Sequence, residues 1–217
     1  MYKHIIFDLD GTILNTLEDL ASATNWVCAR RGWPVHEVEE FKYFVGNGAP
    51  KLLSRVVPDG VELTDELHRQ LLEEFTQRYN AHKEDTTTIY AGMPQTLKRL
   101  KEAGYKLAVL SNKPHGAAWP VVERYYPGIF DAVQGALPEV PVKPDPTLLH
   151  RLMGELGATQ ADTLFVGDSN VDIRTAKNGG LTGCGVLWGF RTRAELEAEG
   201  ADFIVETPAE LAELILG

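Results

Sequence analysis

Short apolar runs that end in polar residues recur along this chain and limit the folds that it can adopt. The first run, His4-Ile5-Ile6-Phe7, leads directly to Asp8 and Asp10. An apolar run this short, without alternation of polar residues, is typical of a β-strand that is buried on both faces. Similar runs lie at residues 106–110, 163–166, 185–188 and 202–205. We therefore expect several buried strands of a parallel sheet.

Segments with the features of helices separate these runs from Gly92 to the end of the chain. The segments at residues 94–103, 146–156 and 170–178 are followed by Gly104, Gly157 and Gly179. Glycine is favoured there because a helix commonly ends in a left-handed residue. Alternation of strands and helices predicts an α/β fold, a doubly wound, Rossmann-like parallel sheet with its ligand site beyond the carboxyl ends of the strands.

Residues 16–82 interrupt this alternation, because their apolar residues recur only at helical spacing. The sequence Thr16-Leu17-Glu18-Asp19 has the form of a helix-capping box. Further along, Leu67, Leu71, Phe75 and Tyr79 share one face of a predicted helix. We expect a helical cap at residues 16–82, inserted into a catalytic core of residues 1–15 and 83–217.

Charge and composition exclude some partners and favour one compartment. The 217 residues carry a formal net charge of -10, which argues against nucleic acid, because a phosphate-backbone binder needs a basic face. Since no apolar run approaches the length of a membrane span, we expect no membrane partner. The two cysteines, Cys28 and Cys184, lie far apart without metal-ligand spacing. This pattern suits a reducing environment and predicts a cytoplasmic protein.

Charged residues at the expected strand ends form the candidate site. Asp8 and Asp10 follow the first strand and Asp168 follows a later one, so three carboxylates should meet at one edge of the sheet. Such crowding is costly unless a cation is present, and Mg²⁺ prefers oxygen ligands and bridges to substrate phosphates. Metal and Lys143 together would also make the pocket locally positive in an acidic protein.

Four motifs in order along the chain resemble those of the haloacid dehalogenase-like hydrolase superfamily, whose members are mostly phosphatases. They are Asp8-Leu9-Asp10-Gly11-Thr12-Ile13-Leu14-Asn15-Thr16, Leu110-Ser111-Asn112-Lys113, Lys143-Pro144-Asp145-Pro146 and Gly167-Asp168-Ser169-Asn170-Val171-Asp172. Each stands at an expected strand end or before an expected helix, which makes the match specific.

The resemblance implies a role for each carboxylate. Asp8 would be the nucleophile that forms an aspartyl-phosphate, and Asp10 the general acid and base. Asp8, Asp168 and the backbone carbonyl of Asp10 would bind Mg²⁺, while Asp172 would orient the metal's waters or Lys143. Dehalogenases of the superfamily lack the second aspartate, so Asp10 favours a phosphatase.

The resemblance also implies residues that bind the substrate. In the core these are Thr12, Ser111, Asn112 and Lys143. In the insertion, Phe44-Val45-Gly46-Asn47-Gly48 is similar to the cap loop of phosphoglycolate phosphatases, with Gly46, Asn47 and Gly48 facing the leaving group. Cations nearby in the sequence, at Lys42, Lys51 and Arg55, suit a small acidic substrate.

We therefore expect a Mg²⁺-dependent phosphatase of a small phosphorylated metabolite, with 2-phosphoglycolate the best candidate, acting as a monomer or homodimer. Three alternatives remain: a phosphomutase similar to β-phosphoglucomutase, a pyrophosphatase or nucleotide phosphatase, and a non-catalytic binding protein on the same scaffold. Single residues also have simpler interpretations. Ser111 alone could be a helix cap and residues 46–48 a turn between helices.

Overall fold

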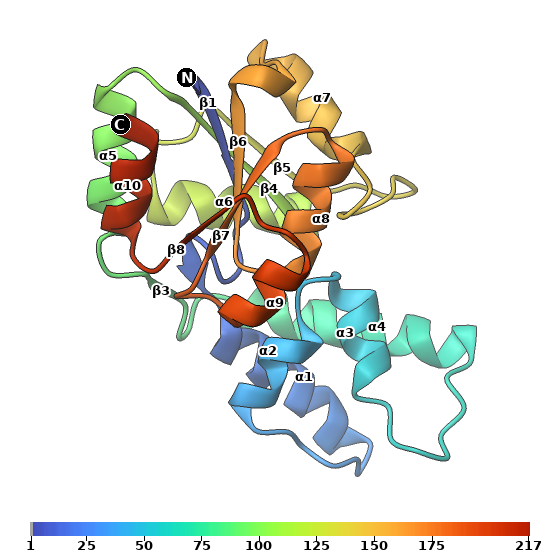
Figure 1. The fold of residues 1–217 in the computed structure, drawn as a ribbon. Coiled ribbons are helices and arrows are strands. Elements are labelled where there is room, and N and C mark those ends of the chain that lie inside the picture. Colours follow the sequence, from blue (N-terminus) through green and yellow to red (C-terminus); the bar gives the residue numbers. More distant parts are fainter. Residues whose placement is uncertain (1) are drawn as a thin grey trace. The chain divides into compact units, whose positions relative to one another are not determined.

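The computed structural model, which describes residues 2–217, divides the chain into two units (Figure 1). One unit joins the chain up to Asn15 with Ile89–Gly217, and the other is the inserted segment Thr16–Thr88. We expected the second boundary between residues 82 and 83, and it lies between Thr88 and Ile89. Two short strands that pair with each other, β2 (Leu14–Asn15) and β3 (Thr88–Ile89), mark where the chain leaves and re-enters the first unit.

A six-stranded sheet in the order β5-β4-β1-β6-β7-β8 organises the first unit, and all of its neighbouring strands are parallel. This confirms the expected α/β fold with a doubly wound parallel sheet. The strands are β1 (His4–Phe7), β4 (Lys106–Pro114), β5 (Ala132–Ala136), β6 (Thr163–Gly167), β7 (Thr182–Val186) and β8 (Phe203–Val205). Because β1 lies between β4 and β6, the residues that follow these three strands come together.

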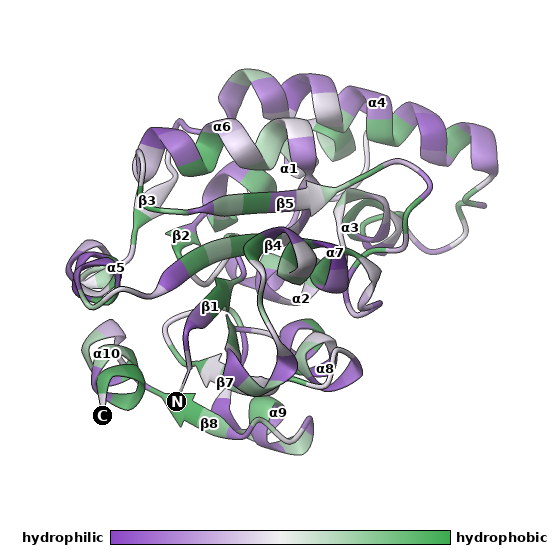
Figure 2. Cartoon of the chain, turned by 90° about the horizontal axis from the view of Figure 1, so that it is seen from above, coloured by the Kyte–Doolittle hydropathy of each residue, from purple (hydrophilic) through white to green (hydrophobic). Residues whose placement is uncertain are grey.

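Apolar side chains cover both faces of the sheet, which is why its strands read as unbroken apolar runs. Helices α5 (Met93–Glu102), α6 (His115–Tyr125) and α10 (Pro208–Leu216) pack on one face. Helices α7 (Thr147–Leu156) and α8 (Asn170–Asn178) pack on the other. In Figure 2, α5 and α10 lie on one side of β1 and β7, and α7 and α8 lie on the opposite side. None of the helices in residues 2–217 has the length and apolar character needed to cross a bilayer.

Three details of the first unit differ from expectation. Strand β5 was not expected, because its sequence, AVQGA, contains Gln134 and Gly135 in place of an apolar run. Strand β7 begins and ends earlier than expected and contains Gly183 and Gly185. Gly185 admits close helix packing, because a Cβ there would lie 2.8 Å from the Leu196 side chain on α9 (Arg193–Ala198). After α8, Gly179 is right-handed with φ −83°, and Gly180, with φ +71°, is the left-handed residue.

The inserted unit is built from helices, as expected. They are α1 (Leu17–Arg30), the 3-10 helix η1 (Val38–Glu40), α2 (Phe41–Phe44), α3 (Ala49–Arg55) and α4 (Asp65–His82). Buried apolar residues on α1, α3 and α4 form its interior.

The expected capping box at the start of α1 is wrong. The Asp19 side chain takes no part in a capping box, and the Thr16 side chain makes no cap hydrogen bond. Asp19 instead accepts hydrogen bonds from the backbone N–H and hydroxyl of both Thr86 (3.0 and 2.7 Å) and Thr87 (2.9 and 2.7 Å). These bonds attach the returning segment to α1, which explains why residues 83–88 belong to the inserted unit.

Candidate active site

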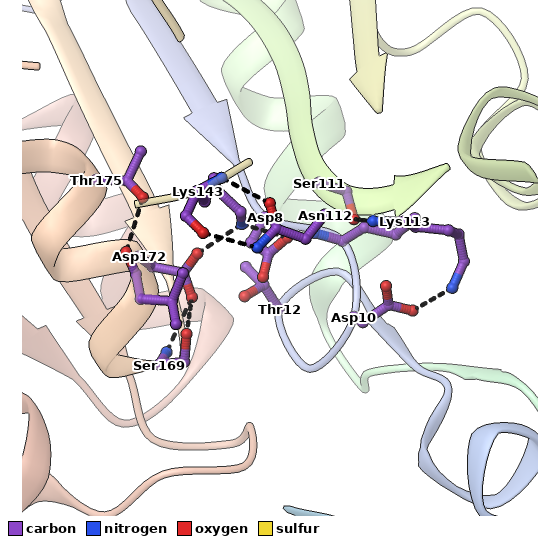
Figure 3. Close-up of polar contacts among 12 residues, drawn as sticks. Asp8, Asp10, Thr12, Ser111, Asn112, Lys113, Lys143, Ser169, Asp172 and Thr175 are labelled. Carbon is purple, nitrogen blue, oxygen red and sulfur yellow. Dashed lines mark hydrogen bonds and ion pairs between the residues drawn. The ribbon is translucent and has the colours of Figure 1, made fainter. Parts of the chain in front are cut away.

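The sheet topology brings the predicted core residues together at its carboxyl edge (Figure 3). Asp8 follows β1 directly, and its backbone N–H donates to the Val166 carbonyl of β6 (2.9 Å). Ser111 lies in β4 on one side of Asp8, and Asp168 follows β6 on the other. The four motifs thus occupy one site because parallel strands end on the same edge.

Lys143 is the buried cation of this site. Its Nζ lies 2.8 Å from Asp8 Oδ1 and 2.7 Å from Asp172 Oδ1. Burial alone would lower the pKa of this ammonium, but the charges of Asp172 and Asp8 outweigh burial and raise it. Lys143 therefore remains charged at neutral pH.

Asn112 holds the backbone of Lys143 in place. Its Oδ1 accepts a hydrogen bond from the Lys143 N–H (2.8 Å), and its Nδ2 donates to the Lys143 carbonyl (3.0 Å). Both ends of the amide thus serve a neighbouring loop. These contacts give Asn112 a positioning role, and the substrate binding that we expected of it stays a prediction.

Three buried carboxylates converge beside Lys143. Asp8, Asp168 and Asp172 each place one oxygen within 4.8 Å of the others. Burial, then the charge of Asp172, raises the pKa of Asp8 well above its usual value and that of Asp168 to about 7. One ammonium cannot neutralise three carboxylates, so the cluster has the charge and the hard oxygen donors that a divalent cation such as Mg²⁺ requires.

The cluster differs in one member from the carboxylates that we expected to converge. Asp172 belongs to it, whereas the side chain of Asp10 is engaged by a different cation, described below. Asp172 also accepts hydrogen bonds from the Ser169 N–H (3.0 Å) and hydroxyl (2.6 Å), which fixes it in the first turn of α8. The ligand expected from Asp10, its backbone carbonyl, stays a prediction.

Asp168 is held by groups from two loops. The Thr12 hydroxyl donates to its Oδ1 (3.0 Å) and the Phe190 N–H to its Oδ2 (2.8 Å). Gly11, with φ +90°, allows this approach, because a Cβ there would lie 2.4 Å from Asp168 Oδ2. The Thr12 hydroxyl thus orients Asp168, and the substrate binding that we expected of Thr12 stays a prediction.

Sequence reasoning missed three residues around the cluster. The Trp188 indole N–H donates to the Thr12 carbonyl (2.9 Å), which ties the loop after β7 to the first motif. Arg191 is nearly buried, and its charge partly offsets the raised pKa of Asp168. Burial, then the charges of Asp168 and Asp10, raises the pKa of Tyr90, so its hydroxyl stays protonated. None of them lies in the four motifs, so no sequence pattern pointed to them.

Asp10 is paired with Lys113. Lys113 Nζ donates to Asp10 Oδ1 at 2.7 Å, and the two side chains are 4% and 19% exposed. Figure 3 shows this pair apart from the Lys143 contacts. The signal for Lys113 was available, because it directly follows Ser111 and Asn112 in the second motif, but no role was assigned to it.

The predicted cap loop is braced within the inserted unit. Arg55 donates to the Phe44 carbonyl (2.7 Å) and to Asn47 Oδ1 (2.9 Å). Gly46 and Gly48, with φ +110° and +82°, adopt backbone conformations that other residues rarely take. The loop therefore has a defined shape, and Arg55, expected as a substrate cation, contributes to it.

Comparison with known proteins agrees with this geometry. Residues 5–186 match the family described as haloacid dehalogenase-like hydrolase. The phosphoglycolate phosphatase of Mannheimia succiniciproducens is 34% identical over 99% of this chain and 98% of its own length. That of Pseudomonas syringae pv. syringae is 33% identical over 99% of this chain and 79% of its own. The crystal structure of a protein from Lactobacillus delbrueckii subsp. bulgaricus superimposes on this chain with a TM-score of 0.91. The two proteins are 34% identical, and the superposition covers 100% of this chain and 99% of the other.

Proposed function

Because the chain belongs to the haloacid dehalogenase-like hydrolase family and is a phosphatase, we propose that it hydrolyses 2-phosphoglycolate or a closely similar small acid phosphate, with Mg²⁺ and through an aspartyl-phosphate. One observation carries the catalytic part of this proposal. Asp8 lies at the end of β1 in contact with the buried ammonium of Lys143 and beside the carboxylates of Asp168 and Asp172. A carboxylate held in this way can act as a nucleophile toward phosphorus.

The residues present fit the proposed metal. Asp8, Asp168 and the backbone carbonyl of Asp10 would hold Mg²⁺, and Asp172 would orient Lys143 and the metal's waters. When bound, the ion would neutralise the phosphoryl oxygens and the excess negative charge of the cluster. Lys143 would contribute the second positive charge, and Ser111 a hydroxyl donor, to the same oxygens.

Asp8 and Asp10 divide the proton and phosphoryl chemistry between them. An Asp8 oxygen would form a bond to phosphorus as the bond to the leaving oxygen breaks, and Asp10 would give its proton to that oxygen. In the second half, Asp10 would take a proton from water, whose oxygen attacks phosphorus and releases Asp8 and inorganic phosphate. Positioned acid–base groups of this kind contribute roughly 10²–10⁴-fold to rate.

The names of two relatives support the choice of phosphoglycolate, since both align along 99% of this chain and are named phosphoglycolate phosphatase. The test is a panel of phosphoglycolate, sugar phosphates, nucleotides and pyrophosphate, assayed with Mg²⁺ and with excess chelator. We expect kcat/KM for phosphoglycolate to exceed the others by at least about tenfold. A nucleotide, pyrophosphate or sugar phosphate as preferred substrate would overturn this choice, and an isomerised sugar phosphate would indicate a mutase.

Residues 46–48 are proposed to contact the leaving group and so to determine substrate specificity. The variant Asn47→Ala tests this. It should lower kcat/KM for phosphoglycolate more than for p-nitrophenyl phosphate, whose activated leaving group needs fewer contacts. Asn80→Ala, at an exposed position of α4 in the same unit, is the matched control. If the ratio of the two kcat/KM values is the same in Asn47→Ala as in wild type, the loop does not select the substrate.

A further inference from the structure

The end of β4 departs from regular strand geometry where the second motif lies. Its pairing with β5 is regular up to Leu110 and shifts register between Leu110 and Pro114. In a regular strand, successive side chains point to opposite faces, whereas a bulge re-aims them. Every residue of β4 from Leu107 to Lys113 is buried, so the side chains at the shifted end of the strand, Ser111, Asn112 and Lys113, also lie in the interior.

Packing and hydrogen bonds fix this irregular segment. The Lys113 N–H donates to Ser111 Oγ (3.1 Å). On β5, Gly135 faces the Lys113 backbone so closely that a Cβ there would lie 2.6 Å from the Lys113 carbonyl oxygen. The backbone of Lys113 is therefore held in one place, and with it the origin of the side chain that reaches Asp10.

The two lysines of the site contact different carboxylates. Lys143 contacts Asp8 and Asp172, and Lys113 contacts Asp10 at 2.7 Å. At 19% exposure, the Asp10 side chain is more open to solvent than that of Asp8 (10%) or Asp172 (0%). A partly exposed carboxylate keeps a single rotamer only if a fixed group binds it. The Lys113 side chain, which is 4% exposed, is such a group for Asp10.

We propose that Lys113 is the positioning residue for the general acid and base, fixing one Asp10 oxygen so that the other faces the leaving oxygen and then the attacking water. The inference rests on the proposed function, in which Asp10 carries the proton. Correct placement of a catalytic group contributes strongly to rate, because misplacement by about 1 Å can cost about 10²-fold. Lys113 acts through Asp10 and need not touch the substrate.

A leaving-group comparison separates this role from a structural one. Phosphoglycolate releases a basic alkoxide that must be protonated, whereas p-nitrophenyl phosphate releases a stable phenolate. Lys113→Met should lower kcat/KM for phosphoglycolate by about 30-fold, within the range of acid–base contributions, and kcat/KM for p-nitrophenyl phosphate by less than about threefold. The comparison uses kcat/KM because it reports phosphorylation of Asp8, whereas hydrolysis of the aspartyl-phosphate is common to both substrates. The increase in Tm produced by Mg²⁺ should change little.

Lys106→Met is the matched control for Lys113→Met. It removes an exposed lysine from the start of the same strand, where Lys106 pairs with Asp131, and should leave both activities unchanged. Lys113→Arg retains the charge and serves as a second variant where Lys113→Met is poorly folded. Its activity on phosphoglycolate should lie between those of wild type and Lys113→Met.

A double-mutant cycle with Asp10→Asn gives the decisive outcome. Asp10→Asn alone should show the same leaving-group dependence of kcat/KM, and adding Lys113→Met should cause no further loss, because Lys113 acts only through Asp10. Equal losses on both substrates, or additive losses in the double variant, would overturn the positioning role. If Asp10→Asn itself spares phosphoglycolate hydrolysis, the proposed function fails instead.

Discussion

Lys143 and Asp172 form an ion pair from which water is almost wholly excluded, with Nζ 2.7 Å from Oδ1 and side-chain exposures of 2% and 0%. The same ammonium contacts Asp8, so one cation supports two buried carboxylates. A buried pair of this kind is costly to break, because the remaining charge loses its compensation. We therefore expect Lys143 to contribute to folding stability, in addition to the phosphate binding proposed for it.

Lys143→Met should lower the free energy of unfolding of the metal-free protein by about 3 kcal/mol or more at about pH 8. The loss should be smaller at about pH 5, where protonation of Asp168, whose pKa is about 7, removes one negative charge from the cluster. Urea unfolding at both pH values measures it, with Lys106→Met as the control. Equal losses at the two pH values would contradict the electrostatic explanation.

Asp8→Asn should abolish turnover and leave the metal-free protein at least as stable as wild type near pH 8. The pKa of Asp8 is raised in the folded state, which means that ionising this carboxyl group destabilises the folded protein relative to the unfolded chain. The neutral amide of Asn avoids this loss of stability. Activity and Tm in excess chelator are the two readouts. A marked fall in Tm would show that ionised Asp8 stabilises the fold, contrary to the direction of its pKa.

Mg²⁺ should bind more tightly as the pH rises from about 6 to about 8. The pKa of Asp168 is about 7, so at pH 6 most molecules must lose a proton before this ligand can bind the metal. Affinity should rise by about tenfold from pH 6 to pH 8, as expected for loss of one proton. Calorimetric titrations at three pH values would detect the change together with the released proton. A constant affinity would mean that Asp168 is already ionised at pH 6.

The metal-free protein should show the reverse trend in stability. In the folded state Asp168 keeps its proton up to about pH 7, whereas its ordinary pKa is 3.8. Stability contributed by this group is thus present at acid pH and declines as the pH rises from about 4 to about 7. Saturating Mg²⁺ should remove the decline, which the same unfolding series can check.

Asp19→Ala should destabilise the inserted unit by about 3 kcal/mol, because charged hydrogen bonds to buried groups are among the stronger ones. The carboxylate is 3% exposed and accepts four hydrogen bonds from Thr86 and Thr87. Hydrogen exchange should increase at residues 83–88. Glu18→Ala, at the exposed neighbouring position, is the control. Unchanged exchange in Asp19→Ala would show that other contacts hold the returning segment.

The sequence was sufficient to predict the parts of the site that depend on topology. Asp8 and Asp168 could be placed together because each follows an apolar run and parallel strands end on one edge. Contacts that depend on tertiary packing could not be predicted. Lys113, which pairs with Asp10, lies where β4 shifts register, and the partners of Asp19 lie 67 and 68 residues away along the chain. Strand β5 was missed because packing, rather than an apolar run, gives it its place.

Trapping the covalent intermediate tests the central claim, that Asp8 is the nucleophile. Asp10→Asn should still be phosphorylated by p-nitrophenyl phosphate, which needs no acid, but should hydrolyse the intermediate slowly because the general base is lost. Borohydride added to this mixture reduces an aspartyl-phosphate to homoserine, which peptide mass spectrometry locates. We predict homoserine at position 8, dependent on both substrate and Mg²⁺. Homoserine at another carboxylate, or unmodified Asp8 in a sample that turns over, would contradict the account.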